Sequence, residues 1–388
     1  MKQKDCISPV HVAGNVKKRD SNIELFRIIA MLLIVAHHYI VNSGLLDVIY
    51  ADSLSGKSIF LLLFGGWGKI GINCFMLITG YFMCKSEITV KKYLKLLGEI
   101  YFYIILINGI FWISGYETFN IKTFVKRILP VTEVAQNFTG CYLLFFLAIP
   151  FLNILIRNLT EKQHIRLIVL CALIYVFFGT VPFFSVTMNY VSWFAVLYFI
   201  ASYIRLYPKQ IFERKKVWGW MTFIFVGLSC VSVIACAWLG KRLGRNMAYY
   251  FVTDSNTLLA VCTAISGFLL FKNIKVPYNK WINRVAATTY GVLLIHANSD
   301  TMRRWLWQDV LKNIGAYSGQ WTIIHAFGCV VGVFVVCSLL DMIRINTVEP
   351  VYLKMLDKWL PKVVGKYRQA ERSICERWKI NNETEPKA

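Results

Sequence analysis

Charged residues are scarce in this sequence. They make up 16% of its 388 residues, whereas hydrophobic residues make up 57% and aromatic residues 15%. A soluble domain contains about 25% charged and roughly 45–50% apolar residues. Because surface-to-volume scaling limits how much apolar surface one fold can bury, this composition excludes a soluble globular protein. We therefore expect the apolar surface to lie in a lipid bilayer.

Metal-binding cysteine spacings, sequence repeats and low-complexity tracts are also missing. The eleven cysteines are scattered, mostly inside apolar runs, and none forms a C-x-x-C pair. This pattern excludes a disulfide framework and a zinc site, and we expect no metal. The cysteines are interpreted as small hydrophobic residues.

Acidic residues are half as numerous as basic ones. The chain has 21 Asp and Glu against 43 Lys and Arg, a formal net charge of +22. Nucleic-acid binding would require a soluble basic face, which the apolar composition does not provide, so no nucleic-acid partner is expected. The basic excess is interpreted as a topology signal and, secondarily, as an attraction to anionic lipid headgroups.

Long apolar runs are what the sequence does contain. A hydrocarbon core of ~30 Å requires about 20 helical residues, and runs of that kind recur along the chain. They predict an all-α, polytopic transmembrane helix bundle of about ten spans, near 23–42, 70–84, 94–114, 138–156, 165–182, 190–206, 217–239, 255–271, 286–299 and 320–343. A shorter run at 59–67 lies among glycines. It is either a re-entrant or interfacial piece or the first half of a broken helix.

The distribution of Lys and Arg predicts the orientation. With the N-terminus in the cytoplasm, that side receives most of the basic groups, at 17–19, 85–95, 157–166, 205–216, 272–284 and after 344. An even number of spans then returns the C-terminus to the cytoplasm. We expect a cytoplasmic segment 1–20, a membrane domain 21–350 and a basic cytoplasmic tail 351–388. The first apolar run lacks a small-residue cleavage site, so it is expected to remain as the first span.

The first span carries four ionisable side chains, Glu24, Arg27, His37 and His38. Such groups cost about 2.5–3.5 kcal/mol each in a span, so they mostly face the bundle interior and serve function. Glu24 and Arg27 are one helical turn apart and can pair. Arg27 and His38 are eleven residues apart, on nearly the same helix face and ~16 Å apart along the axis. In the simpler interpretation, Arg27 snorkels to the interface and the histidines cap the outer end of the span.

Other polar residues within the apolar regions have plainer interpretations. His325 is expected to be a hydrogen-bonded interhelical histidine, and Glu99 is placed to pair with Lys95 on one helix face. Lys69 lies among glycines and is expected at an interface. The sequence assigns no role to His296, at the end of the ninth predicted span, or to Glu349 after the last.

Six blocks of the sequence occur together in one known family. They are the Glu24, Arg27 and His38 set, the segments 71–81, 141–153, 197–203 and 290–296, and the pair Glu349-Pro350. In this order, on about ten spans, they resemble the acyltransferase 3 family of integral membrane acyltransferases, over about residues 19 to 350. The chain differs from the family pattern in having Glu24 for the usual Asp and Thr79 for the usual Ser, and in lacking the Trp that opens the third block. Lys91 and Lys95 stand where many members carry an Arg-x3-Arg pair.

The resemblance implies a multi-pass enzyme of a bacterial plasma membrane. Such an enzyme moves an acyl group, acetyl being typical, from acetyl-CoA or another acyl-CoA to a hydroxyl of a surface glycan or its lipid-linked precursor. A neutral imidazole suits the removal of that hydroxyl's proton, and we expect His38 to be the general base, with His37 structural. Glu24 and Arg27 would shape the cytoplasmic end of the cavity. Arg27, Lys91, Lys92 and Lys95 would receive the coenzyme A phosphates, although Lys lacks the bidentate fork of Arg.

Two other functions stay open from the sequence. A transporter or flippase for a lipid-linked glycan or small solute would suit the intramembrane Arg and His residues. Many transporters are built from internal repeats, but the second half of this sequence does not resemble the first, which argues against a transporter. A non-catalytic membrane scaffold or sensor that retains the family fold is the other alternative. The acceptor, the acyl group and the route of the acyl group across the bilayer are not specified by the sequence.

Overall fold

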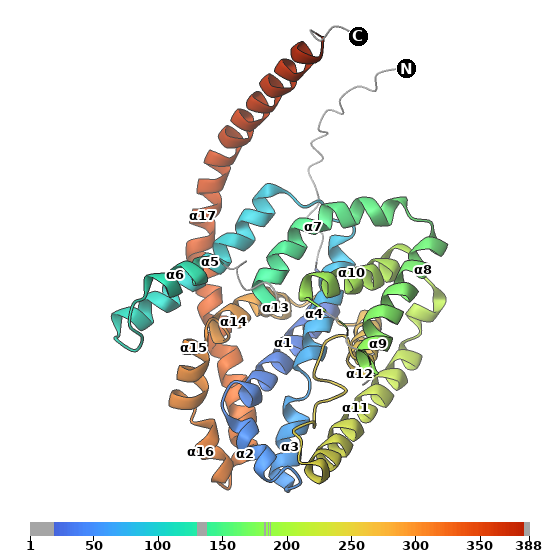
Figure 1. Cartoon of the computed structure of the whole chain (residues 1–388), viewed down its shortest axis with the longest axis vertical. Coiled ribbons are helices and arrows are strands. Elements are labelled where there is room, and N and C mark those ends of the chain that lie inside the picture. The colour runs from blue at the N-terminus through green and yellow to red at the C-terminus, as the bar shows by residue number, and fades with distance from the viewer. Residues whose placement is uncertain (1–18, 130–137, 182–183, 185, 187, 384–388) are drawn as a thin grey trace.

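The computed structural model of the chain describes residues 19–129, 138–181, 184, 186 and 188–383, and every regular element within them is helical. Figure 1 shows the helices packed side by side as a bundle, which confirms the all-α prediction. Most of the predicted segment 1–20 lies outside the described residues. In chain order the elements are α1 Ser21–Val41, α2 Leu45–Ala51, α3 Gly56–Gly65, α4 Gly68–Met83, α5 Val90–Ile113, α6 Ile121–Ile128, α7 Phe138–Asn158, α8 Glu161–Cys171, η1 Ala172–Phe177, α9 Phe178–Thr180, α10 Tyr190–Leu206, η2 Gln210–Glu213, α11 Lys215–Leu243, α12 Leu258–Asn273, α13 Lys280–Ala287, α14 Thr289–His296, α15 Asp300–Arg304, η3 Trp305–Val310, α16 Asn313–Ser318 and α17 Thr322–Glu383.

Within the described residues, seven helices are long and apolar enough to cross a membrane. They correspond to seven of the ten predicted spans. The predicted spans at 190–206 and 255–271 are the shorter apolar helices α10 and α12. The run at 286–299 is divided at Thr288 between α13 and the eight-residue α14. The chain is therefore a membrane helix bundle in which some helices are shorter than about 20 residues, the length that crosses the hydrocarbon core unaided.

Helix α1 lies at the centre of the bundle. It packs against α3, α4, α12, α13, α14 and α17. Its two faces enter different apolar clusters: Met31 and Ile34 belong to one, and Phe26 and Ala30 to the other. Because neighbours surround it, the ionisable groups of α1 face other helices and not lipid, as expected for polar groups within a span.

The short apolar run at 59–67 proves to be the first half of a broken helix. Helices α3 and α4 are separated by Gly66 and Trp67 and together form one candidate span, Gly56–Met83. At the break, the His37 ring Nδ1 lies 2.7 Å from the Gly65 carbonyl oxygen and donates to it. This contact satisfies a carbonyl at the end of α3, where helical partners run out. His37 is thus a structural contact of the break, as expected.

Helix α4 begins in close contact with the His37 ring, and this is possible because residue 68 is a glycine without a side chain. A Cβ atom there would lie 2.3 Å from the His37 Cγ. We expect Gly68→Ala to destabilise the protein by about 1–3 kcal/mol through overpacking. Thermal unfolding in detergent measures this effect. Gly227→Ala in α11, where a Cβ would meet nothing within 4 Å, is the matched control, and equal melting temperatures for the two variants would refute the steric account.

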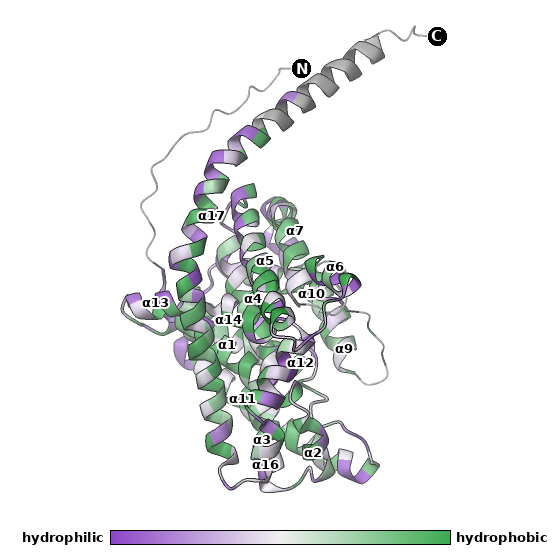
Figure 2. Cartoon of the chain, turned by 90° about the vertical axis from the view of Figure 1, so that its left-hand side faces the viewer, coloured by the Kyte–Doolittle hydropathy of each residue, from purple (hydrophilic) through white to green (hydrophobic). Residues whose placement is uncertain are grey.

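Helix α17 is one continuous helix of 62 residues that contains Pro350 and Pro361. Its candidate span runs from Thr322 to Gly365. In Figure 2 it is largely green where it lies along the bundle, and more purple appears where it leaves the bundle. The predicted tail 351–388 therefore continues the last helix up to Glu383.

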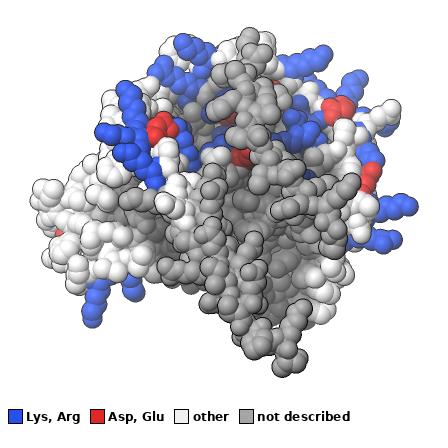
Figure 3. Space-filling view, turned by 90° about the horizontal axis from the view of Figure 1, so that it is seen from above, with Lys and Arg blue, Asp and Glu red and all other residues white. Residues whose placement is uncertain are grey.

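Lysine and arginine gather at one end of the bundle, which we call the basic face. It contains the start of α1, the loop between α4 and α5, the starts of α8 and α11, and the part of α17 that carries Lys354, Lys358 and Lys362. Figure 3 looks onto this face and shows many Lys and Arg side chains around it, with few Asp and Glu among them. The end of the bundle at which α1 finishes is called the opposite face.

Candidate functional site

Two histidines from helices far apart in the sequence meet inside the bundle. His38, near the end of α1, and His296, the last residue of α14, are joined by a 2.9 Å contact between His38 Nδ1 and His296 Nε2. The His296 side chain is fully buried and packs edge-on against the Trp307 ring. His38 is part-buried. The sequence alone assigned no role to His296, and the structure makes it the partner of the predicted base.

The hydrogen bonds of His296 determine which nitrogen of His38 carries a proton. His296 Nδ1 lies 2.6 Å from the Val292 carbonyl oxygen. A carbonyl only accepts, so His296 Nδ1 carries a proton, and in neutral His296 the Nε2 is then an acceptor. His38 Nδ1 then donates to that acceptor, which leaves the lone pair on His38 Nε2. The arrangement thus holds neutral His38 in the tautomer and orientation that a base requires.

Close packing between α14 and α17 positions His296. A Cβ on Gly291 would lie 2.2 Å from the Asp341 Cγ, so only glycine lets α14 approach α17 at this point. Asp341 is fully buried. It accepts hydrogen bonds from Tyr103, at 2.7 Å, and from Arg344, at 2.6 Å. A charged network therefore supports the helix that carries His296.

The predicted Glu24–Arg27 pair is present near the basic face. The Arg27 Nε lies 3.2 Å from Glu24 Oε2, and its guanidinium lies over the Phe75 ring at 5.3 Å from the centroid. The Glu24 side chain is 7% exposed and that of Arg27 is 21% exposed. The rise of eleven helical residues separates this pair from His38 by ~16 Å. The structure therefore places the pair and His38 at two levels of one helix, without direct contact.

All three lysines predicted to bind the acyl donor have partners. Lys91 Nζ lies 2.6 Å from Asp357, Lys95 Nζ lies 2.5 Å from Glu349, and Lys92 Nζ donates to Ser86 and to the Glu87 carbonyl. The ion pairs of Lys91 and Lys95 join the start of α5 to α17. The Lys91–Asp357 pair is exposed on both sides, at 42% and 60%, so it contributes little to stability and can exchange its anion. In the Lys95 pair the lysine is 46% exposed but Glu349 is only 11% exposed.

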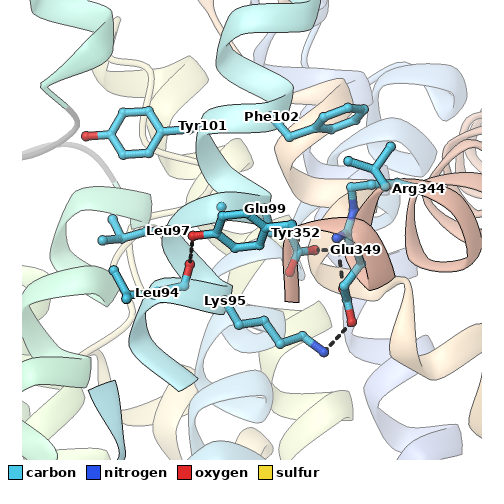
Figure 4. Close-up of a pocket in the computed structure, with 11 residues that line it drawn as sticks. Leu94, Lys95, Leu97, Glu99, Tyr101, Phe102, Arg344, Glu349 and Tyr352 are labelled. Atoms are coloured by element: carbon cyan, nitrogen blue, oxygen red, sulfur yellow. Dashed lines mark hydrogen bonds and ion pairs between the residues drawn. The ribbon is translucent and has the colours of Figure 1, made fainter. Parts of the chain in front are cut away.

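A cavity of about 440 Å³ lies between α5 and α17 on the side of the basic face. Figure 4 shows Lys95 and Glu349 beside it, with Arg344 reaching toward Glu349. The Glu99 carboxylate pairs with Arg344 at 3.1 Å and not with Lys95, so the predicted Glu99–Lys95 pair is wrong. Lys95 instead reaches across to the other helix, because α17 offers it the carboxylate of Glu349 at 2.5 Å.

A second polar cluster supports the chain just beyond His296. The Arg127 guanidinium donates to Glu117 at 2.8 and 2.9 Å and to Asn108 at 2.5 Å. Hydrogen bonding from Arg127 holds the pKa of Glu117 below its usual range. Glu117 also accepts from Thr301 in α15, at 3.0 Å. The cluster thereby fixes α15, which follows α14, to α5 and α6.

His325 has the interhelical role expected from the sequence. Its Nε2 lies 3.0 Å from the Leu311 carbonyl oxygen and therefore donates to it. Its Nδ1 then accepts the hydroxyl of Tyr39, at 2.9 Å. The contact attaches α17 to the end of α1, one residue after His38.

Comparison with known protein families gives a match over most of the chain. No curated protein and no solved structure is significantly similar to the chain. The model of the acyltransferase 3 family, described as an acyltransferase domain, matches residues 20–342. This segment includes Glu24, Arg27, His38, the three lysines of α5 and His296. The chain therefore belongs to the acyltransferase 3 family of membrane proteins.

Proposed function

We propose that the protein transfers an acetyl group from acetyl-CoA to a hydroxyl of a surface glycan or its lipid-linked precursor. The observation that carries this proposal is the Val292–His296–His38 chain of hydrogen bonds. In neutral His38 this chain leaves the Nε2 lone pair free, the state in which imidazole acts as a general base near neutral pH. The family of membrane acyltransferases supplies the reaction type.

The proposed reaction uses one base in two steps. His38 Nε2 takes the proton of the acceptor hydroxyl while the oxygen attacks the thioester carbonyl carbon, forming the new C–O bond. The tetrahedral intermediate then expels coenzyme A as the C–S bond breaks, and the proton on His38 passes to the departing sulfur. His38 returns to its neutral state. His296 never touches the reacting atoms and is a positioning residue.

The basic face is the proposed donor side. Lys and Arg gather there, as the positive-inside rule requires of a cytoplasmic surface. Lys91, Lys92 and Lys95 would receive the coenzyme A phosphates by exchanging their present partners for phosphate oxygens. Arg27 and Glu24 lie between this face and His38. The donor either threads its acyl end inward to His38 or passes the group on across the bilayer.

Removing His296 should lower the rate of transfer more than it weakens substrate binding. His296→Ala leaves His38 Nδ1 without its acceptor, so the imidazole loses its orientation and its fixed tautomer. We expect kcat to fall by about 10²-fold, the cost of a misplaced catalytic group, with little change in KM. Steady-state transfer at varied acceptor concentration measures both. A larger change in KM than in kcat would contradict the positioning role.

The proposed function is tested in membrane vesicles from cells that make the protein and from matched cells that lack it. Radiolabelled acetyl-CoA is supplied with the host's surface glycan. Label that enters the glycan only in vesicles with the protein, and that hydroxylamine releases as an ester would be released, supports the transferase. Glycan or solute that crosses the vesicle membrane without gaining label would support the transporter instead.

A further inference from the structure

A second cavity, of about 410 Å³, opens at the opposite face next to the histidine pair. Its size falls within the roughly 300–1,000 Å³ typical of small-ligand sites. We call it the opposite-face cavity. It is formed where the end of α1 meets α2, the start of α4 and the loop between α11 and α12. Its lining includes His37, Lys69, Asn246 and Thr253 and the rings of Tyr50, Tyr249 and Tyr250.

The opposite-face cavity is close to the proposed base. His37 lines it, and the His37 ring centroid lies 6.0 Å from that of His38. Lys69, at the start of α4, also lines it. A molecule bound in this cavity would therefore lie against His37, the residue before His38, on the side of the bundle away from the proposed donor lysines.

The cavity's polar groups are those that recognise sugars. Three tyrosine rings offer apolar faces, while Asn246 and Thr253 offer an amide and a hydroxyl for hydrogen bonds. The Tyr249 hydroxyl is buried without a hydrogen-bond partner among the described residues. Burial also raises the pKa of Tyr249, so its hydroxyl stays protonated and can donate. The tyrosine rings, the amide and the Thr253 hydroxyl are therefore the groups of this cavity that suit a hydroxyl-rich ring.

Lys69 adds a charge that no carboxylate neutralises in the part of the chain the structure describes. Its Nζ donates to the Tyr190 hydroxyl at 2.7 Å and lies 5.4 Å from that ring's centroid. The nearby Lys241, in contrast, pairs with Asp52. An unpaired ammonium at the wall of a cavity favours an anionic ligand.

We infer that the opposite-face cavity is the acceptor subsite and that it takes a sugar bearing an anionic group, with Lys69 as the residue that selects for charge. This inference rests on the proposed function for the identity of the bound molecule as an acceptor. The shared chemistry is a hydroxyl-rich ring with a carboxylate or a phosphate. The ring lies among the tyrosines and the anion lies against Lys69.

Direct binding tests the cavity independently of transfer. The probes are a uronic-acid disaccharide, a phosphorylated disaccharide and the neutral disaccharide of the same linkage. Their affinities are measured by calorimetry for the His38→Asn protein in nanodiscs, which keeps the cavity and removes the proposed base. We expect at least one anionic probe to bind about tenfold or more tightly than the neutral one. The difference between the carboxylate and the phosphate probes identifies the anion.

Lys69→Gln, made in the same His38→Asn background, should remove that preference while leaving neutral-sugar affinity unchanged. Lys69→Arg should retain most of it, and Lys241→Gln is the matched control for loss of one lysine at the same face. Equal binding of charged and neutral probes, or no binding of any probe, would overturn the inference. If binding is charge-selective and depends on Lys69, but the wild-type protein transfers no acetyl group, the cavity is a binding site for an anionic sugar and the proposed transferase function is wrong.

Discussion

Replacing His38 with asparagine is expected to lower the rate of acetyl transfer by about 10²–10⁴-fold, the usual contribution of a general base. The asparagine amide places a donor close to the position of Nδ1, so the hydrogen bond to His296 Nε2 can persist. What the variant loses is the basic lone pair of Nε2. Because fold and contacts are retained, protein amount and melting temperature should change little. Transfer is measured in membranes with matched amounts of protein.

The control for this variant is another buried histidine outside the site. His164 on α8 hydrogen-bonds the Phe199 carbonyl through Nε2, at 3.0 Å. His164→Gln keeps a donor at that position and should leave transfer near the wild-type rate. If His38→Asn transfers as fast as His164→Gln, His38 is not the base.

Replacing Arg344 with glutamine is expected to cause the largest loss of stability among single polar substitutions in the bundle. The Arg344 side chain is 5% exposed and contacts three carboxylates, Asp341 at 2.6 Å, Glu349 at 2.9 Å and Glu99 at 3.1 Å. Breaking a buried ion network by removing one partner costs about 3–5 kcal/mol, because buried charge is left uncompensated. Thermal unfolding of the purified protein in one detergent measures this loss.

Two companion variants separate this effect from a general loss of surface charge. Lys241→Gln removes a cation from an exposed pair, whose side chains are 50% and 62% exposed, and should cost less than about 1 kcal/mol. Adding Asp341→Asn to Arg344→Gln removes one uncompensated carboxylate and should restore part of the stability. A melting temperature for Arg344→Gln equal to that of Lys241→Gln would show that the network contributes nothing.

Most of the fold follows from hydropathy, because a helix must satisfy its own backbone hydrogen bonds in lipid. The long apolar runs at 23–42 and 217–239 are helices at nearly the predicted positions. The run at 286–299 shows the limit of this approach. The eight-residue helix α14 in this run is buried among other helices. Its apolar side chains therefore contact neighbouring helices, whereas those of a full span would contact lipid. The hydropathy of the sequence also does not predict that α17 continues as a helix beyond Pro350.

The candidate site was predictable only where its contacts are local. Glu24 and Arg27 are three residues apart, and helical geometry alone brings them together. His38 and His296 are 258 residues apart, and their contact depends on how α14 packs against α1. A periodic pattern contains no information about such packing. The Lys95–Glu349 ion pair could not be predicted for the same reason, because Glu349 lies more than 250 residues further along the chain.

The most direct test of the central claim uses the purified protein in liposomes with acetyl-CoA and a glycan acceptor. Free coenzyme A thiol and acetyl ester on the acceptor are measured together over time. We predict that wild-type protein forms both in equal amounts and that His38→Asn at the same protein density forms neither above background. Acetyl-CoA that stays intact with wild-type protein while the glycan moves across the bilayer would contradict the account and identify a transporter.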